Sequence, residues 1–262
     1  MKTCDVLNGA LLAATAFLAQ GEPWKTKLIG LKQVEPFPEP EATTIGDKAG
    51  VKFKPQIHVS AGCPSYPAVN AAGETTYGDW IEETADVKCE ELKVKSQVYG
   101  RSTWHLEKFA VMYTWHFPTS PNYTERYDWE HVVVWLNNPA VANPTLEAVS
   151  IWSEGKKAYI KAAPPDAKFM DGSSVKLDIG VDGQARKLSL SPLAGQFQPL
   201  IMWDQMPNDT RSALDATKWY GLFIPLSDSR LTLALDNAWP FAPVAPPPLL
   251  ISTSPKQPPS SD

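Results

Sequence analysis

Apolar and polar residues alternate through much of this chain, with the period of two that is typical of β-strands. In residues 109–117, large apolar side chains stand at every second position. Segments with strand character are residues 56–59, 96–99, 109–117, 131–136, 148–152, 158–160, 175–177 and 200–203. The pattern predicts a protein built mainly from sheets.

Helical patterns are fewer. Asn208 or Asp209 can cap a helix through residues 210–220, which Gly221 would end. Residues 227–239 place apolar side chains at helical spacing as well. Many short strands with few helices predict a mainly β fold, a β-sandwich with flanking helices.

The two ends of the chain differ in composition from its middle. An apolar run over residues 6–19 follows Lys2 and is too short to span a bilayer comfortably, so we interpret residues 1–21 as a secretory signal peptide. A buried amphipathic helix is the alternative, and Pro23 disfavours it. We predict an extended arm over residues 22–45, one domain over residues 46–241 and a disordered Pro/Ser-rich tail over residues 242–262.

Composition and charge limit the classes of function that this chain can have. The 262 residues are 43% hydrophobic and include ten tryptophans, which is enough for one good core. The net charge of −5 offers no basic surface for nucleic acid, so we expect no nucleic-acid partner.

Exported proteins commonly carry disulfides and glycans. Cys4 would leave with the signal peptide, so Cys63 and Cys89 remain as a pair that can form a disulfide or stay as two buried thiols. Asn122 and Asn208 each begin a glycosylation sequon.

Residues 127–135, YDWEHVVVW, hold the main candidate site. Side chains alternate along a strand, so Asp128 and Glu130 point the same way at the start of an apolar strand. The two carboxylates can therefore bind one cation or substrate together. Alternatively the two acids are solvated or pair with Arg126. His131 lies on the opposite face, and we expect it to be a packed side chain rather than a ligand.

The segment FAVMYTWHFPTSPNYTERYDWEHVVVW, residues 109–135, resembles the centre of the necrosis- and ethylene-inducing-peptide-like proteins, which are secreted cytolysins and elicitors of plant-associated microbes. Further similar blocks are residues 51–69, 97–102 and 198–207. The resemblance covers roughly residues 32–239. It implies a β-sandwich similar to actinoporins and fungal lectins, a disulfide between Cys63 and Cys89, and an acidic cavity. In that cavity a divalent cation would engage the sugar headgroup of glycosylated inositol sphingolipids in plant plasma membranes.

The chain departs from the family at its heptapeptide. Where the family has Gly-His-Arg-His-Asp-Trp-Glu, residues 124–130 read Thr-Glu-Arg-Tyr-Asp-Trp-Glu. Asp128 and Glu130 match the family's acidic ligands, Glu125 replaces the first histidine, and Tyr127 replaces the second. A further aspartate of the family, in the preceding loop, has no clear counterpart. Three carboxylates still suit a hard cation, Mg²⁺ or Ca²⁺, and we expect Glu125 to be the third ligand.

These observations predict a secreted effector in the host apoplast that acts at the plant plasma membrane, with cytolysis weakened or lost. One alternative is a decoy that binds a carbohydrate or a host protein, such as a host surface receptor, without damage. A second is a glycosidase using Asp128 and Glu130, which we disfavour because neighbours on one strand seldom flank a sugar bond from both sides. We therefore do not expect an enzyme.

Overall fold

The computed structural model describes residues 24–76, 96–117, 128–183, 185–219 and 223–242. A larger sheet has the strand order β12-β4-β5-β6-β7-β8. Its strands are β4 (Val98–His105), β5 (Lys108–Phe117), β6 (Asp128–Leu136), β7 (Leu146–Ser153), β8 (Ala158–Ala162) and β12 (Leu200–Met202). All neighbours are antiparallel except β12 and β4.

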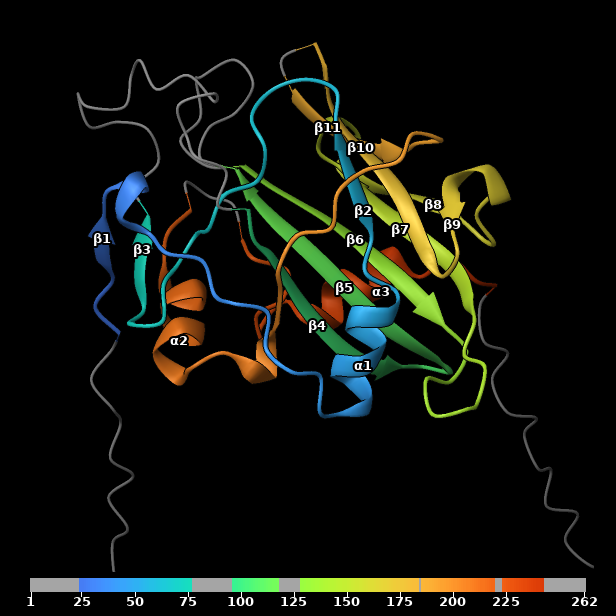
Figure 1. Ribbon diagram of the computed structural model, residues 1–262, viewed down its shortest axis with the longest axis horizontal. Coiled ribbons are helices and arrows are strands. Elements are labelled where there is room, and N and C mark those ends of the chain that lie inside the picture. The colour runs from blue at the N-terminus through green and yellow to red at the C-terminus, as the bar shows by residue number, and fades with distance from the viewer. Residues whose placement is uncertain (1–23, 77–95, 118–127, 184, 220–222, 243–262) are drawn as a thin grey trace, which may run out of the picture.

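A smaller sheet lies across one face of the larger sheet (Figure 1). Its strands are β2 (Gln56–Val59), β9 (Met170–Asp171), β10 (Ser174–Asp182) and β11 (Ala185–Leu190). A separate short pair joins β1 (Lys27–Ile29) to β3 (Glu74–Thr76). The predicted class, mainly β with a sandwich core, is confirmed.

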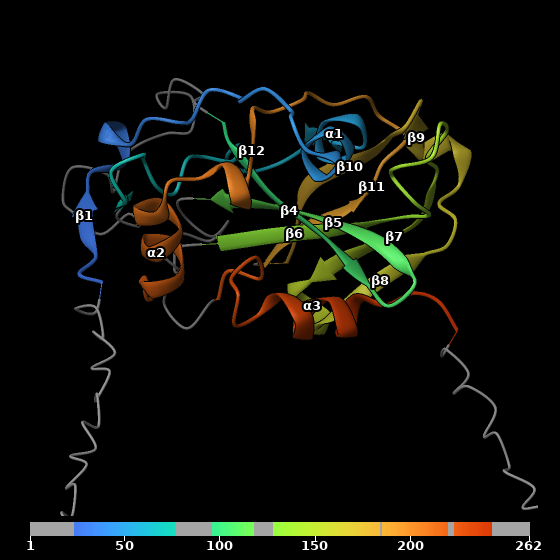
Figure 2. The same ribbon diagram turned by 90° about the horizontal axis from the view of Figure 1, so that it is seen from below.

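Helices cover both faces of the larger sheet. Figure 2 shows α1 (Ile45–Lys52) on the side of the smaller sheet and α3 (Leu231–Ala238) on the opposite side. The remaining helices are α2 (Asn208–Ala216) and the short 3-10 turns η1 (Leu31–Gln33), η2 (Glu154–Lys156), η3 (Ala167–Phe169) and η4 (Trp203–Gln205). Of the described residues, no helix has the length and apolar character needed to cross a membrane.

The alternation in β5 and β6 sorts side chains into two cores. Val111, Tyr113 and Val132 pack toward the smaller sheet, where they meet Leu177 and Ile179. On the other face of the larger sheet, a second cluster is rich in tryptophan and joins the sheet to the helices. It includes Met112, Trp129, Val133, Trp135, Trp219 and Leu235. The two faces therefore separate as the sequence pattern predicted.

Two predicted helices exist with altered bounds. The first runs from Asn208 to Ala216, starting two residues earlier and ending four residues before the predicted segment does. The second, α3, buries Leu231, Leu235 and Ala238. Strand β6 begins at Asp128, three residues before the predicted segment, which places both acids inside the strand.

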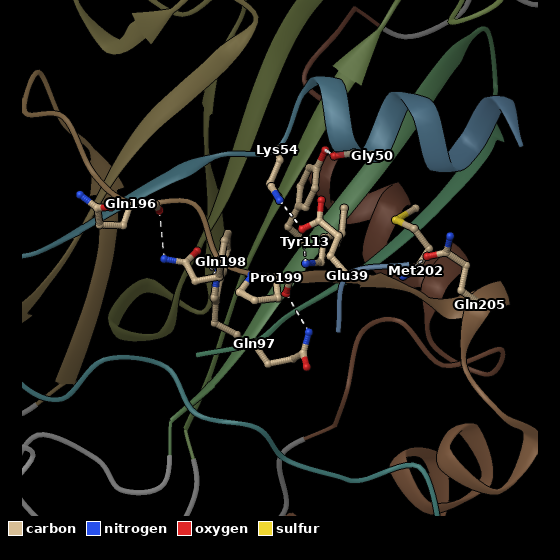
Figure 3. A network of polar contacts seen from close by, with 12 residues as sticks. Glu39, Gly50, Lys54, Gln97, Tyr113, Gln196, Gln198, Pro199, Met202 and Gln205 are labelled. Carbon is tan, nitrogen blue, oxygen red and sulfur yellow. Dashed lines mark hydrogen bonds and ion pairs between the residues drawn. The ribbon is translucent and has the colours of Figure 1, made fainter. Parts of the chain in front are cut away.

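The segment predicted as an extended arm, residues 22–45, packs on the domain from Trp24 onward and contains only the short elements β1 and η1 before α1 begins. Val34 is fully buried. The Phe37 amide donates to Gln97 Oε1 at 2.7 Å, and Gln97 Nε2 donates to the Pro199 carbonyl at 2.7 Å. Glu39 accepts from Lys54 Nζ at 2.5 Å and from the Leu200 amide at 2.8 Å (Figure 3). These bonds tie the segment to the sheet and to the end of α1.

The predictions for the two termini concern residues that the structure does not describe. The signal peptide (residues 1–21) falls outside the described residues, and so does the tail beyond residue 242.

Candidate functional site

The site lies where β6 begins, beside the end of β5. Asp128 is opposite Phe117 and Glu130 is opposite Trp115 in the antiparallel ladder. Both acids share a face of β6 with Val132, the face turned toward the smaller sheet. Asp128 keeps a side-chain exposure of 13%, whereas Glu130 is 1% exposed. The two carboxylates thus differ in depth, with Asp128 nearer to solvent.

Asp128 forms an ion pair with Arg186 of β11. Arg186 Nε donates to Asp128 Oδ2 at 2.7 Å, and the Arg186 side chain is 1% exposed. Arg186 Nη1 also donates to the Cys63 carbonyl at 3.4 Å. The guanidinium lies 3.9 Å from the centre of the Phe117 ring. Arg126, which the sequence offered as a partner, lies outside the described residues, and Arg186 was not anticipated.

A local signal for Arg186 did exist. The segment ARKLSL alternates, and Arg186 stands on the same face as Leu188 and Leu190. An arginine at an inward position of a strand needs a partner, because a buried unpaired charge is costly. The sequence could have indicated that a carboxylate pairs with Arg186 across the core, although not which carboxylate.

Glu130 is buried without a hydrogen-bond partner among the described residues. Neither carboxyl oxygen has a hydrogen bond within the described part of the chain. Burial raises the pKa of Glu130 well above its ordinary value, the negative charge of Asp128 raises it further, and Arg186 opposes the shift. Unless a cation or donor reaches it, this carboxyl therefore favours its protonated form.

Two histidines flank the acids on the opposite face of the sheet. The ring of His116 has Nδ1 3.1 Å from the Tyr66 carbonyl, and burial lowers the pKa of His116 to about 3. His131 stacks on Trp152, with Nε2 2.7 Å from the Tyr159 hydroxyl. Burial lowers the pKa of His131 to about 3. His131 is a packed side chain, as expected.

The loop before β3 supports the site from the side. Cys63 is disulfide-bonded. Its carbonyl contacts Arg186, and the Tyr66 amide donates to the His116 carbonyl at 2.8 Å. Cys89 lies outside the described residues, so its pairing with Cys63 stays a prediction. The disulfide-bearing loop therefore reaches both the end of β5 and the partner of Asp128.

Other predicted site residues are only partly placed. Glu125 and Asn122 lie outside the described residues. Asn208 is exposed at the first residue of α2, where its side-chain oxygen accepts from Arg211, and Thr210 of its sequon is buried. Glycosylation of either asparagine stays a prediction.

The described acids offer only part of the ligand set that a divalent cation needs. Within the described ranges, no group of three His, Cys, Asp or Glu side chains is arranged to hold a metal. Glu130 nevertheless offers two unsatisfied oxygens beside Asp128, and carboxylate oxygen is what Mg²⁺ and Ca²⁺ prefer. The two acids fit part of a cation shell, and Asp128 already shares its charge with Arg186.

Comparison with known proteins identifies the family. The family model described as "Necrosis inducing protein (NPP1)" matches residues 47–238. The chain belongs to this necrosis-inducing family. NLP effector protein 2 of Phytophthora capsici is 44% identical over 213 residues, which cover 80% of this chain and 86% of that protein.

Solved structures of the family share the fold. The crystal structure of the non-toxic HaNLP3 protein superposes with a TM-score of 0.73 at 39% identity, covering 80% of this chain and 99% of HaNLP3. NLPPya in complex with glucosamine superposes with a TM-score of 0.71 at 33% identity, covering 81% of this chain and 98% of NLPPya. Of these relatives, the first is an effector protein, and HaNLP3 is non-toxic.

Proposed function

We propose that this member of the necrosis-inducing family is a secreted effector that acts at the plant plasma membrane. Asp128 and Glu130, with Glu125 as a third ligand, would hold a divalent cation, Mg²⁺ or Ca²⁺. The cation would engage the sugar headgroup of glycosylated inositol sphingolipids, and cytolysis would be weakened or lost. The observation that carries the proposal is Glu130, a buried carboxylate with two unsatisfied oxygens beside a second acid.

Burial without a partner is the reason to expect a ligand at Glu130. An unpaired buried carboxylate costs free energy, and proteins retain such groups mainly where a ligand, ion or proton satisfies them. A bound cation would reverse the raised pKa of Glu130, because ligation requires the ionised form. Glu130 would bind the cation, and Asp128 would provide the more exposed oxygen that faces the ligand.

Three observations support weakened cytolysis. The heptapeptide lacks both histidines of the family, at Glu125 and Tyr127. Arg186 also engages Asp128, which reduces the negative charge available to a cation. The similarity to HaNLP3, a non-toxic protein, supports the same direction. The complex of NLPPya with glucosamine supports a carbohydrate ligand for this chain too.

The proposal can be tested on lipid vesicles. Vesicles with glycosylated inositol sphingolipid should sediment the purified mature protein in Mg²⁺ or Ca²⁺, and chelation by EDTA should release it. Dye leakage should be far weaker than that caused by a toxic relative at equal bound protein. A lack of binding to lipid, cation and plant membrane alike would refute the proposal, and vigorous leakage would refute the weakening.

Variants separate the site from the scaffold. Glu130→Gln removes the charge at nearly constant shape and should abolish cation-dependent sedimentation. Glu107→Gln is the matched control, since Glu107 is exposed in the turn between β4 and β5, at the opposite end of β5. Binding to carbohydrate or to a host surface receptor that survives Glu130→Gln would favour the decoy alternative. Glycan turnover lost in Glu130→Gln would favour the glycosidase.

A further inference from the structure

Arg186 is held rigidly at the acid pair by contacts from three other segments. It bonds Asp128 of β6 at 2.7 Å and the Cys63 carbonyl at 3.4 Å, and it covers the Phe117 ring of β5 at 3.9 Å. Its side chain is 1% exposed, so it has no route to solvent without leaving all three. The guanidinium is therefore a fixed charge of the site.

This fixed charge changes what the acids can bind. With both acids ionised, as cation ligation requires, Asp128, Glu130 and Arg186 together carry a net charge of −1. Hard divalent cations bind most tightly where several carboxylates are uncompensated. One of the two described carboxylates is compensated already.

The distances place Arg186 close to any cation on Asp128. A ligated cation lies about 2.0 to 2.6 Å from a carboxylate oxygen. Arg186 Nε lies 2.7 Å from Asp128 Oδ2. The guanidinium charge would then be within roughly 6 Å of the cation, where like charges in a buried setting repel strongly.

We propose that Arg186 is a built-in competitor for the cation at Asp128 and lowers the cation affinity of this site. The inference rests on the proposed function in that it requires a cation site at Asp128 and Glu130. Arg186 acts through Asp128 and is a positioning residue. It holds the acid against the smaller sheet and lowers the charge available to the cation.

Replacing Arg186 by a neutral side chain of similar length tests this inference. In Arg186→Met, the dissociation constant for Mg²⁺ and Ca²⁺ should fall about tenfold or more, because a nearby like charge is removed. Arg186→Lys keeps the charge and should stay near wild type. Lys187→Met is the matched control, since Lys187 is an exposed neighbour on β11 whose ion pair with Asp182, at 3.2 Å, is on the surface.

The assay is calorimetric titration with each cation, paired with thermal unfolding in the presence and absence of the cation. Cations should raise the melting temperature of Arg186→Met more than that of wild type, a result that a purely structural role for Arg186 would not give. If Arg186→Met fails to fold, Arg186→Gln takes its place in both assays. Glutamine also removes the charge but keeps a hydrogen-bond donor for Asp128.

The outcomes separate the two proposals. Cation binding by wild type, with equal or weaker binding by the folded neutral variants, would overturn the competitor role and leave the proposed function standing. Binding by the neutral variants alone would support the competitor role in its strongest form. No binding by any variant would overturn both, because no cation site would then exist for Arg186 to compete at.

Discussion

Glu130→Gln should stabilise the cation-free protein at neutral pH, which is unusual for a change inside a core. The wild-type carboxyl is buried with no partner among the described residues, and burial raises its pKa well above 4.5. In the unfolded chain the same group ionises near its ordinary value. Between these two pKa values the unfolded state releases a proton that the folded state keeps, so stability falls as pH rises.

The magnitude follows from the size of that interval. Each pH unit above 4.5 removes about 1.4 kcal/mol of stability until the pH reaches the folded pKa. Over the pH range from 4.5 to 7, this slope limits the loss at pH 7 to about 3 to 4 kcal/mol. Glutamine is neutral at every pH and nearly isosteric, so Glu130→Gln should lack this loss while keeping the packing.

Denaturant unfolding between pH 4.5 and pH 8, with EDTA present, measures the effect. Wild type and Glu130→Gln should have similar stability near pH 4.5 and diverge as pH rises, with the variant more stable at pH 7 by at most about 3 to 4 kcal/mol. Glu107→Gln should follow wild type. Parallel profiles for wild type and Glu130→Gln would refute the reasoning, because they would show that Glu130 titrates alike in both states.

Three further predictions concern the scaffold. Burial holds the pKa of His131 at about 3, below its ordinary 6.5, so the stability that the neutral ring contributes is present above pH 6.5 and is lost as pH falls. In urea unfolding between pH 6.5 and pH 5, the free energy of unfolding of His131→Gln should fall by about 2 kcal/mol less than that of wild type. Equal losses would contradict this. Trp219→Ala should cost about 3 to 5 kcal/mol, because Trp219 is 1% exposed and its indole donates to the Leu214 carbonyl, and a cost below 1 kcal/mol in the same assay would be inconsistent with that packing. In the oxidised protein, Cys63→Ser should lower the free energy of unfolding by about 2 to 5 kcal/mol relative to wild type. Under reducing conditions the variant and wild type should be equally stable. A difference of the same size under reduction would mean that the disulfide is not the cause.

Local pattern was sufficient for the central strands and insufficient for two elements beside them. Strands β5, β6 and β7 were found because their residues alternate over a long stretch with few interruptions. Helix α1 was missed because Gly46 and Gly50 weaken helix propensity. Its glycines are explained by packing, since a Cβ at Gly46 would lie 2.4 Å from Ser102 Oγ and a Cβ at Gly50 would lie 2.7 Å from Met202 Sδ.

Strand β11 was missed for a related reason. Arg186 interrupts what would otherwise be an apolar inward face, and a charged residue there lowers the strand signal. The strand exists because β10 pairs with it over six residues and because Asp128 neutralises the arginine. Asp128 lies 58 residues away along the chain, so the local pattern of residues 185–190 contains no sign of the charge that neutralises Arg186.

The sequence by itself determined that Asp128 and Glu130 share one face at the start of a buried strand, because side-chain direction in a strand depends only on residue spacing. It also determined the family, through the blocks around residues 51–69, 109–135 and 198–207. The tertiary structure alone decided that the two acids are unlike. Asp128 meets an arginine 58 residues away on the other sheet, while Glu130, two positions along the strand, is buried without a described partner. Charge pairing and desolvation depend on what the fold brings together across the core, so residue spacing could not have distinguished the two carboxylates.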